Sequence, residues 1–192
     1  MPTLRSLPRS FYTRPTLTVA RALLGCLFVR RLNGVRLILR IVEVEAYTQK
    51  DPASHTYRGR TPRNEVMYLS GGHLYVYFTY GMHYCANVVS GPAGRGEAVL
   101  IRAGEPLEGT ELMRRNRGRD GFDLTNGPAK LCQALGLGRG ENGTDLTGDT
   151  IFVSRGVRIP PSVMGRSGRI GITTATEKRW RFFVRGNPWV SK

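Results

Sequence analysis

The dipeptide Asn33-Gly34 restricts what this chain can fold into, because it separates two segments that favour β-structure. Asn-Gly is the preferred centre of a two-residue β-hairpin turn. Residues 26–32 before it form an apolar run, and residues 35–47 after it have high β propensity. The sequence therefore predicts a long antiparallel hairpin early in the chain.

The second strand of this hairpin carries two carboxylates among apolar side chains. In a regular strand, alternate side chains share one face. Counting along residues 35–47 places Glu43 and Glu45 on the face of Leu37 and Ile41, with Tyr47 next. A buried carboxylate is costly unless it is paired or used. We therefore expect paired or functional acids at the end of an apolar stripe.

The rest of the pattern mixes helices with antiparallel strands. Residues 1–14 read as an irregular arm, and residues 48–66 as a long polar connection of a kind that is usually functional or mobile. Without a regular βαβ rhythm, the sequence predicts the α+β class, and 192 residues fit a single domain over residues 1–192. The expected helices cover residues 15–24, 107–117 and 127–135, and the expected further strands cover residues 74–79, 83–89, 98–103, 151–158, 170–172 and 181–185.

The chain is strongly basic. Its 29 Lys and Arg against 14 Asp and Glu give a formal net charge of +15. Such a charge attracts nucleic acid phosphates or anionic membranes. No run of 18 apolar residues predicts a transmembrane helix, and residues 2–14 lack the pattern of a signal peptide. We therefore expect a nucleic-acid partner, no membrane partner, and a cytoplasmic, nucleoid-associated protein.

The cysteines and histidines do not form a metal-binding pattern. The three cysteines are far apart without a CxxC pair, which favours reduced thiols. The three histidines do not pair with them at zinc spacing. The H-x-E and P-C-x-x-C motifs of a zinc-dependent deaminase are also missing. We therefore expect no structural metal.

Residues 43–87 concentrate acidic, aromatic and amide side chains. An enzyme that acts on a base in duplex DNA must rotate it out of the stack. Tyr47, Tyr77 and His55 could stack such a base, and ring stacking contributes ~1–3 kcal/mol per base. The alternative is that Tyr75 and Tyr77 are ordinary core residues. Tyr80 is expected at a hairpin tip, where an exposed aromatic ring suits a wedge between base pairs.

Glu45 is the best candidate for a general base. Hydrolysis of an N-glycosidic bond needs a carboxylate that takes a proton from water and stabilises a cationic sugar. Glu43 competes for this role, and its alternative is a salt bridge to Arg40 or Arg102. Arg102 lies in an apolar segment, where a buried cation needs an acidic partner.

Several motifs in one order resemble the alkyladenine (3-methyladenine) DNA glycosylase family, over residues 12–191. The resemblance implies a mixed α/β domain with a curved antiparallel sheet, surrounding helices, a protruding hairpin and no cofactor. It is carried by Glu43-Val44-Glu45-Ala46-Tyr47, Thr61-Pro62-Arg63-Asn64, residues 74–87, residues 100–106, Gly127-Pro128-Ala129-Lys130 with the four residues that follow, and residues 183–191.

The resemblance also implies a role for individual residues. Glu45 would activate the hydrolytic water, with Arg102 holding it, and Tyr80 would intercalate in the emptied stack. The flipped base would be bound by Tyr47, His55, Tyr77, Asn87 at the pocket floor, and the main chain near Ile172. The residues that would border the DNA are Thr61, Arg63, Asn64, Met82, His83, Arg117 and Lys130.

The implied substrates are 3-methyladenine, 7-methylguanine, hypoxanthine and ethenoadenine in double-stranded DNA, which a monomer would excise. A lyase step needs an amine nucleophile, and no lysine lies in the Glu45 motif, so we expect no strand cleavage. Two alternatives remain open. The chain could be a non-catalytic nucleic-acid-binding protein with a structural Glu45, or a hydrolase of free nucleosides, although a small nucleoside does not require so basic a protein.

Overall fold

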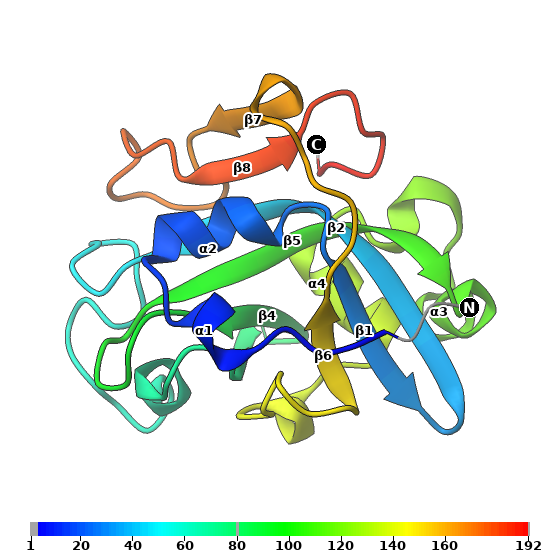
Figure 1. The fold of residues 1–192 in the computed structure, drawn as a ribbon, viewed down its shortest axis with the longest axis horizontal. Coiled ribbons are helices and arrows are strands. Elements are labelled where there is room, and N and C mark those ends of the chain that lie inside the picture. Colours follow the sequence, from blue (N-terminus) through cyan, green and yellow to red (C-terminus); the bar gives the residue numbers. More distant parts are fainter. Residues whose placement is uncertain (1–3, 80, 192) are drawn as a thin grey trace.

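The computed structural model describes residues 4–79 and 81–191. Its strands form one antiparallel sheet in the order β3-β4-β5-β2-β1-β6, with β8 paired to β2 and β7 paired to β8. The sheet curls into a half-barrel (Figure 1), which confirms the α+β class. The strands are β1 (Leu27–Leu32), β2 (Val35–Tyr47), β3 (Leu74–Thr79), β4 (His83–Val89), β5 (Ala98–Glu108), β6 (Ile151–Ser154), β7 (Met164–Ser167) and β8 (Arg181–Val184).

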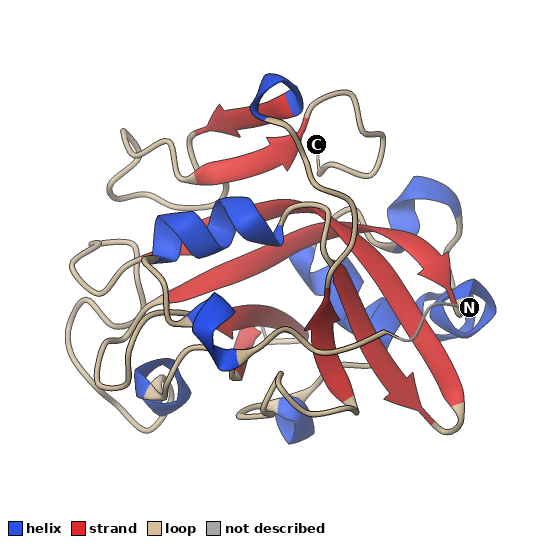
Figure 2. Cartoon of the chain, in the orientation of Figure 1, coloured by secondary structure: helices blue, strands red, loops and turns tan. Residues whose placement is uncertain are grey.

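Short helices surround this sheet (Figure 2). None of those described is long and apolar enough to pass through a membrane. The α-helices are α1 (Arg9–Tyr12), α2 (Thr16–Leu23), α3 (Thr110–Arg117) and α4 (Pro128–Leu135), and the 3-10 helices are η1 (Glu65–Tyr68), η2 (Gly121–Leu124), η3 (Arg139–Glu141) and η4 (Pro161–Val163).

The predicted β1–β2 hairpin is confirmed. Leu32 pairs with Val35, so Asn33 and Gly34 alone form the turn. Their φ angles are 50° and 78°, the left-handed conformation that the central residues of this tight turn require and that Asn and Gly adopt most easily.

A break in the pairing of β2 corrects the predicted arrangement of its side chains. The register with β5 shifts between Ile41 and Glu43 and again before Val44. Such a bulge inserts a residue and changes which side chains share a face. Up to Ile41 the odd-numbered residues pack in the main core, but beyond the bulge Val44 and Ala46 do so. Glu43 and Glu45 therefore leave the apolar stripe and face the other side of the sheet.

The two faces of the sheet have different tasks. Val19 and Leu23 of α2 belong to the same core cluster as Val44 and Ile101 on β2 and β5. Figure 1 shows α2 in front of these strands, with α4 behind them. The alternate residues of β2 and β5, among them Glu45, are directed to the face away from α2.

Several predicted boundaries are wrong. The arm is not irregular throughout, because residues 9–12 form α1 and Tyr12 is fully buried. The helix predicted from Leu107 begins at Thr110, because β5 stays paired with β2 up to Glu108 and Gly109 turns the chain at φ 76°.

The C-terminal third departs further from the prediction. β6 ends at Ser154 instead of continuing to residue 158, and residues 164–167 form β7, which was not predicted. Residues 170–172 are not a strand, since the Ile170 N–H donates to a side chain rather than to a neighbouring strand. This side chain belongs to Glu45, in the site described next.

Candidate active site

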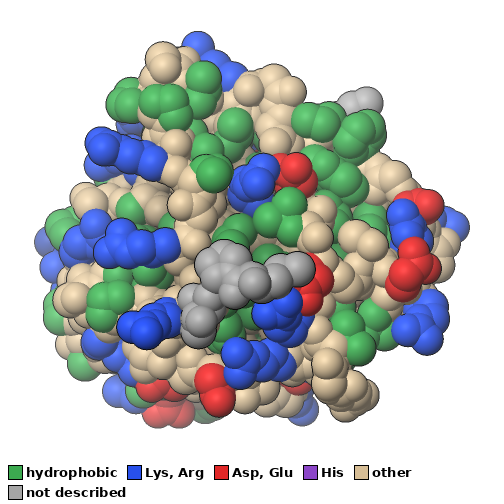
Figure 3. Space-filling model, turned by 45° about the vertical axis from the view of Figure 1, so that its right-hand side comes forward, with side chains coloured by type: hydrophobic (Ala, Val, Ile, Leu, Met, Phe, Trp, Pro, Cys, Tyr) green, Lys and Arg blue, Asp and Glu red, His purple; other side chains and the backbone are tan. Residues whose placement is uncertain are grey.

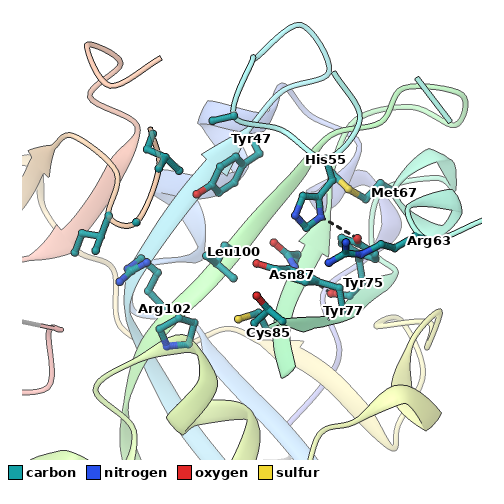
Figure 4. Close-up of a pocket in the computed structure, with 16 residues that line it drawn as sticks. Tyr47, His55, Arg63, Met67, Tyr75, Tyr77, Cys85, Asn87, Leu100 and Arg102 are labelled. Carbon is teal, nitrogen blue, oxygen red and sulfur yellow. Dashed lines mark hydrogen bonds between the residues drawn. The ribbon is translucent and has the colours of Figure 1, made fainter. Parts of the chain in front are cut away.

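A cavity of about 400 Å³ opens on the face of the sheet opposite α2. In Figure 4, Tyr47 and Arg102 lie on one side of it, and His55, Tyr75 and Tyr77 on the other. The lining residues come from β2 to β5, η1, α4 and two loops, and they are Tyr47, Ala53, His55, Arg63, Met67, Tyr75, Tyr77, Thr79, Cys85, Asn87, Leu100, Arg102, Pro128, Ile170, Gly171 and Ile172.

Glu45 lies fully buried beside this cavity with its carboxylate held from three directions. The Tyr47 hydroxyl donates to Oε2 over 2.7 Å, and the Ile170 N–H donates to Oε1 over 2.8 Å. The Arg102 guanidinium is 3.3 Å from Oε1. These donors fix the direction of the carboxylate beside the cavity, and a general base needs such a fixed position.

Glu43 is also fully buried but has a structural role. Its Oε1 accepts from the Nε atoms of Arg102 and Arg181, at 2.9 and 2.6 Å. The Ser191 N–H and hydroxyl donate to its two oxygens over 2.6 and 2.8 Å. These bonds occupy both oxygens of the Glu43 carboxylate within the protein, so Glu45 stays the candidate base. The expected partner Arg102 is confirmed, whereas Arg40 pairs with another glutamate.

Three rings form the side of the cavity opposite Tyr47. Tyr75 and Tyr77 stack with ring centroids 5.5 Å apart, and the His55 ring meets Tyr77 edge-on at 4.5 Å. His55 Nδ1 and the Tyr75 hydroxyl are 3.0 Å apart and hydrogen bonded. Tyr75 is 1% exposed and therefore belongs to the core, but it also lines the cavity. Tyr75 is thus both a core residue and a lining residue of the cavity, so the two alternatives given for it do not exclude each other.

The ring groups around the cavity are held in their neutral forms. Burial raises the pKa of Tyr75 to about 12 and raises the pKa values of Tyr47 and Tyr77 further. His55 as a whole residue is exposed, but desolvation of its imidazole beside the tyrosines, together with the nearby Arg63 charge, lowers its pKa below the ordinary value. At neutral pH the hydroxyls therefore act as hydrogen-bond donors.

Asn87 and Cys85 extend from β4 into the deeper part of the cavity (Figure 4). Asn87 is 5% exposed, and its amide donates to the Tyr75 carbonyl over 3.1 Å. This bond fixes the direction of a side chain that lines the cavity. Cys85 is a buried free thiol. Among the described residues, no three Cys, His, Asp or Glu side chains are placed to hold a metal ion.

Comparison with known proteins decides the family. The model of the methylpurine-DNA glycosylase family matches residues 10–188. The chain belongs to this family. A curated protein of Carboxydothermus hydrogenoformans is 50% identical over 97% of this chain and 98% of its own length. One from Methanoculleus marisnigri is 48% identical, over 97% and 99%. Both carry the name "Putative 3-methyladenine DNA glycosylase".

The segment Thr61-Pro62-Arg63-Asn64 lies at the cavity rim. Arg63 is exposed, lines the cavity and donates to the Phe78 carbonyl over 3.1 Å. Asn64 differs from the expectation that it borders DNA, because it is buried. Its amide donates to the His55 and Gly59 carbonyls, and its oxygen accepts from the exposed Thr61 N–H. Asn64 thus holds the loop that carries His55.

The other predicted DNA contacts lie on separate elements. Met82 is 72% exposed beside the half-buried His83, where β3 turns into β4. Tyr80, the predicted wedge, lies outside the described residues. Arg117 and Lys130, from α3 and α4, both bond to the Asp123 carboxylate, at 3.1 and 2.5 Å. Their roles in DNA binding stay predictions.

Sequence reasoning missed two contributors to the site. Ile170 supplies the backbone donor to Glu45 from 125 residues away, although only Ile172 had been expected nearby. Arg169 lies next to it, with its side chain fully buried. No local pattern marks either residue, because their importance depends on where this loop folds back.

Proposed function

We propose that this chain is a monofunctional DNA glycosylase that flips alkylated or deaminated purines out of duplex DNA and hydrolyses their N-glycosidic bond. The observation that supports this most is the Glu45 carboxylate, oriented by a backbone N–H and a tyrosine hydroxyl at the edge of an aromatic cavity. A cavity of about 400 Å³ accommodates a purine. The proposed substrates are 3-methyladenine, 7-methylguanine, hypoxanthine and ethenoadenine, and the product starts base excision repair.

In this proposal the flipped base stacks between Tyr47 on one side and Tyr77 with His55 on the other. Glu45 takes a proton from water as the water oxygen bonds to the anomeric carbon, while the bond to the base breaks and its electron pair leaves with the base. The ionised carboxylate also stabilises the positive charge that develops on the sugar. Asn87 would reject normal guanine by crowding its amino group.

The basic surface suits the approach of DNA. With a formal charge of +15, the protein attracts the phosphate backbone, and contacts of this kind weaken as salt rises. Figure 3 shows Lys and Arg side chains gathered along the left edge of one face, with acidic side chains mainly to the right and below. We propose that Thr61, Arg63, Met82, His83, Arg117 and Lys130 border the duplex. Tyr80 would fill the emptied stack.

The partner is therefore double-stranded DNA with damaged purines. We propose that the protein acts on it as a monomer, in the cytoplasm and on the nucleoid. Hydrolysis needs no amine, and among the described residues that line the cavity none is a lysine. Lys130 and Lys178 are paired with Asp123 and Asp51. The product would be an abasic site with an intact strand.

Base release from defined duplexes tests this function. Labelled duplexes that contain one hypoxanthine, ethenoadenine or 7-methylguanine are incubated with excess protein, and strand breaks are measured with and without alkali. We expect breaks after alkali only, with at least one lesion, and none in a matched duplex without damage. Breaks without alkali, or a covalent adduct trapped by borohydride, would contradict a monofunctional enzyme. Release from no lesion, with tight binding retained, would indicate a DNA-binding protein without glycosylase activity.

A further inference from the structure

A buried arginine covers the Tyr47 ring. The guanidinium carbon of Arg169 is 4.6 Å from the centroid of this ring. Tyr47 lines the cavity, whereas Arg169 is not among the lining residues. Arg169 therefore lies against the ring away from the space that a base would enter. It also lies 5.4 Å from the centroid of Trp180, so aromatic contacts restrict it further.

An acidic partner fixes the direction of this guanidinium. Both terminal nitrogens of Arg169 donate to the Asp51 carboxylate, a bidentate pair in which neither side chain is exposed. One of them also donates to the Ala46 carbonyl over 3.0 Å, immediately before Tyr47. Bidentate pairs set the plane of a guanidinium as well as its position. The Tyr47 ring thus lies against a surface that cannot rotate freely.

The same pair joins the two loops that complete the cavity. Asp51 is in the loop that leads to His55, and Arg169 is 118 residues away in the loop that includes Ile170. The backbone N–H of Ile170 is the donor to Glu45. A shift of Arg169 would therefore move both the ring that stacks the base and the donor that orients the carboxylate.

Stability alone does not account for such a pair. Desolvating two charges costs about as much as their attraction returns, and apolar side chains of similar size often fill such a space equally well. A bidentate pair does provide a fixed geometry, which an apolar contact does not. Glu45 and Tyr47 need this geometry, because a misplacement of ~1 Å can cost ~100-fold in rate.

We propose that Asp51 and Arg169 are positioning residues for the reaction: their ion pair holds the Tyr47 ring against the flipped base and the Ile170 N–H against Glu45. The proposal rests on the proposed glycosylase function. Neither residue lines the cavity, so neither contacts the substrate directly.

Arg169→Lys tests this arrangement, because lysine keeps the charge but loses the planar, bidentate fork. We expect the maximal single-turnover rate of base release to fall by ~10- to 100-fold, the scale of a small misplacement of the reacting groups. The protein concentration for half-maximal rate should change by less than ~3-fold, because DNA contacts are retained. The matched control is Lys178→Met. Lys178 also pairs with Asp51, but it lies over Trp180 and not over Tyr47. Its rate should stay near that of the wild type.

The double variant Asp51→Asn, Arg169→Met separates positioning from folding. It removes both buried charges together, so we expect it to unfold at a temperature close to that of the wild type. Its rate of base release should stay as low as that of Arg169→Lys. A double variant, or an Arg169→Lys protein, with a wild-type rate would overturn the proposal.

Hydrogen exchange of the Ile170 amide provides a test that does not depend on catalysis. In the protein without DNA, we expect this amide to exchange at least ~10-fold faster in Arg169→Lys than in the wild type, because its bond to Glu45 opens more often. Lys178→Met should leave the exchange unchanged. If the wild type releases no base, the proposed function fails, and this exchange still decides the positioning proposal: equal exchange in wild type and Arg169→Lys would overturn it.

Discussion

Glu45→Gln is expected to abolish base release while duplex binding persists. Glutamine has the same shape, and its carbonyl oxygen can still accept from the Ile170 N–H or the Tyr47 hydroxyl. It cannot take a proton from water or carry the negative charge opposite a cationic sugar. General bases contribute ~10²- to 10⁴-fold to rate, so the single-turnover rate should fall by at least that range.

The measurement compares base release and DNA binding on one lesion duplex. Glu65→Gln is a suitable control, because Glu65 is exposed and, within residues 4–79 and 81–191, forms an ion pair only with the exposed Arg60. We expect the control to retain the wild-type rate and both variants to bind the duplex with wild-type salt dependence. A Glu45→Gln rate within ~3-fold of the wild type would exclude general-base catalysis by this residue, since even modest bases contribute ~10²-fold.

Glu43→Ala is expected to act on stability instead. The substitution leaves the guanidinium groups of Arg102 and Arg181, both nearly buried, without their shared carboxylate, and it removes the acceptor of the Ser191 N–H. Removing one partner of a buried ion pair costs about 3–5 kcal/mol. Single domains unfold with a free energy of about 5–15 kcal/mol in total. The substitution would therefore remove a large part of the free energy of unfolding.

Urea unfolding with and without the substitution measures this loss. Glu105→Ala is the matched control, since the Glu105–Arg40 pair keeps about a third of each side chain in solvent and should contribute only ~0–1 kcal/mol. We expect the midpoint of Glu43→Ala to fall well below that of Glu105→Ala, with a similar slope. Equal midpoints would show that the bonds of Glu43 to Arg102, Arg181 and Ser191 do not stabilise the fold.

The sequence predicts those parts of the fold that depend on local chemistry. Asn33-Gly34 specifies the β1–β2 hairpin without help from the rest of the chain, because only a few residue types adopt two consecutive left-handed conformations. The strand residues Tyr47, Tyr77 and Asn87 are likewise brought to one cavity, since neighbouring strands place alternate side chains together.

What the sequence does not predict depends on distant partners. The bulge near Glu43 lies where β2, already paired with β5, also begins to pair with β8, and a strict period of two along β2 gives no sign of it. Asn64 looks like a surface residue in a polar segment, but the carbonyls it binds become neighbours only when the loop closes. The sequence around Arg169 does not distinguish it from the many other arginines of the chain.

The bond between Glu43 and Ser191 also sets an order of assembly during protein synthesis. A ribosome completes β2 long before it reaches Ser191, which lies 148 residues later. Until then, the nascent chain carries a carboxylate without one of its partners. A chain interrupted before this serine could fold much of its sheet, yet it would lack the hydrogen bonds that Ser191 donates to Glu43. The Glu43 carboxylate thus gains Ser191 as a partner only after Arg102 and Arg181 have been made.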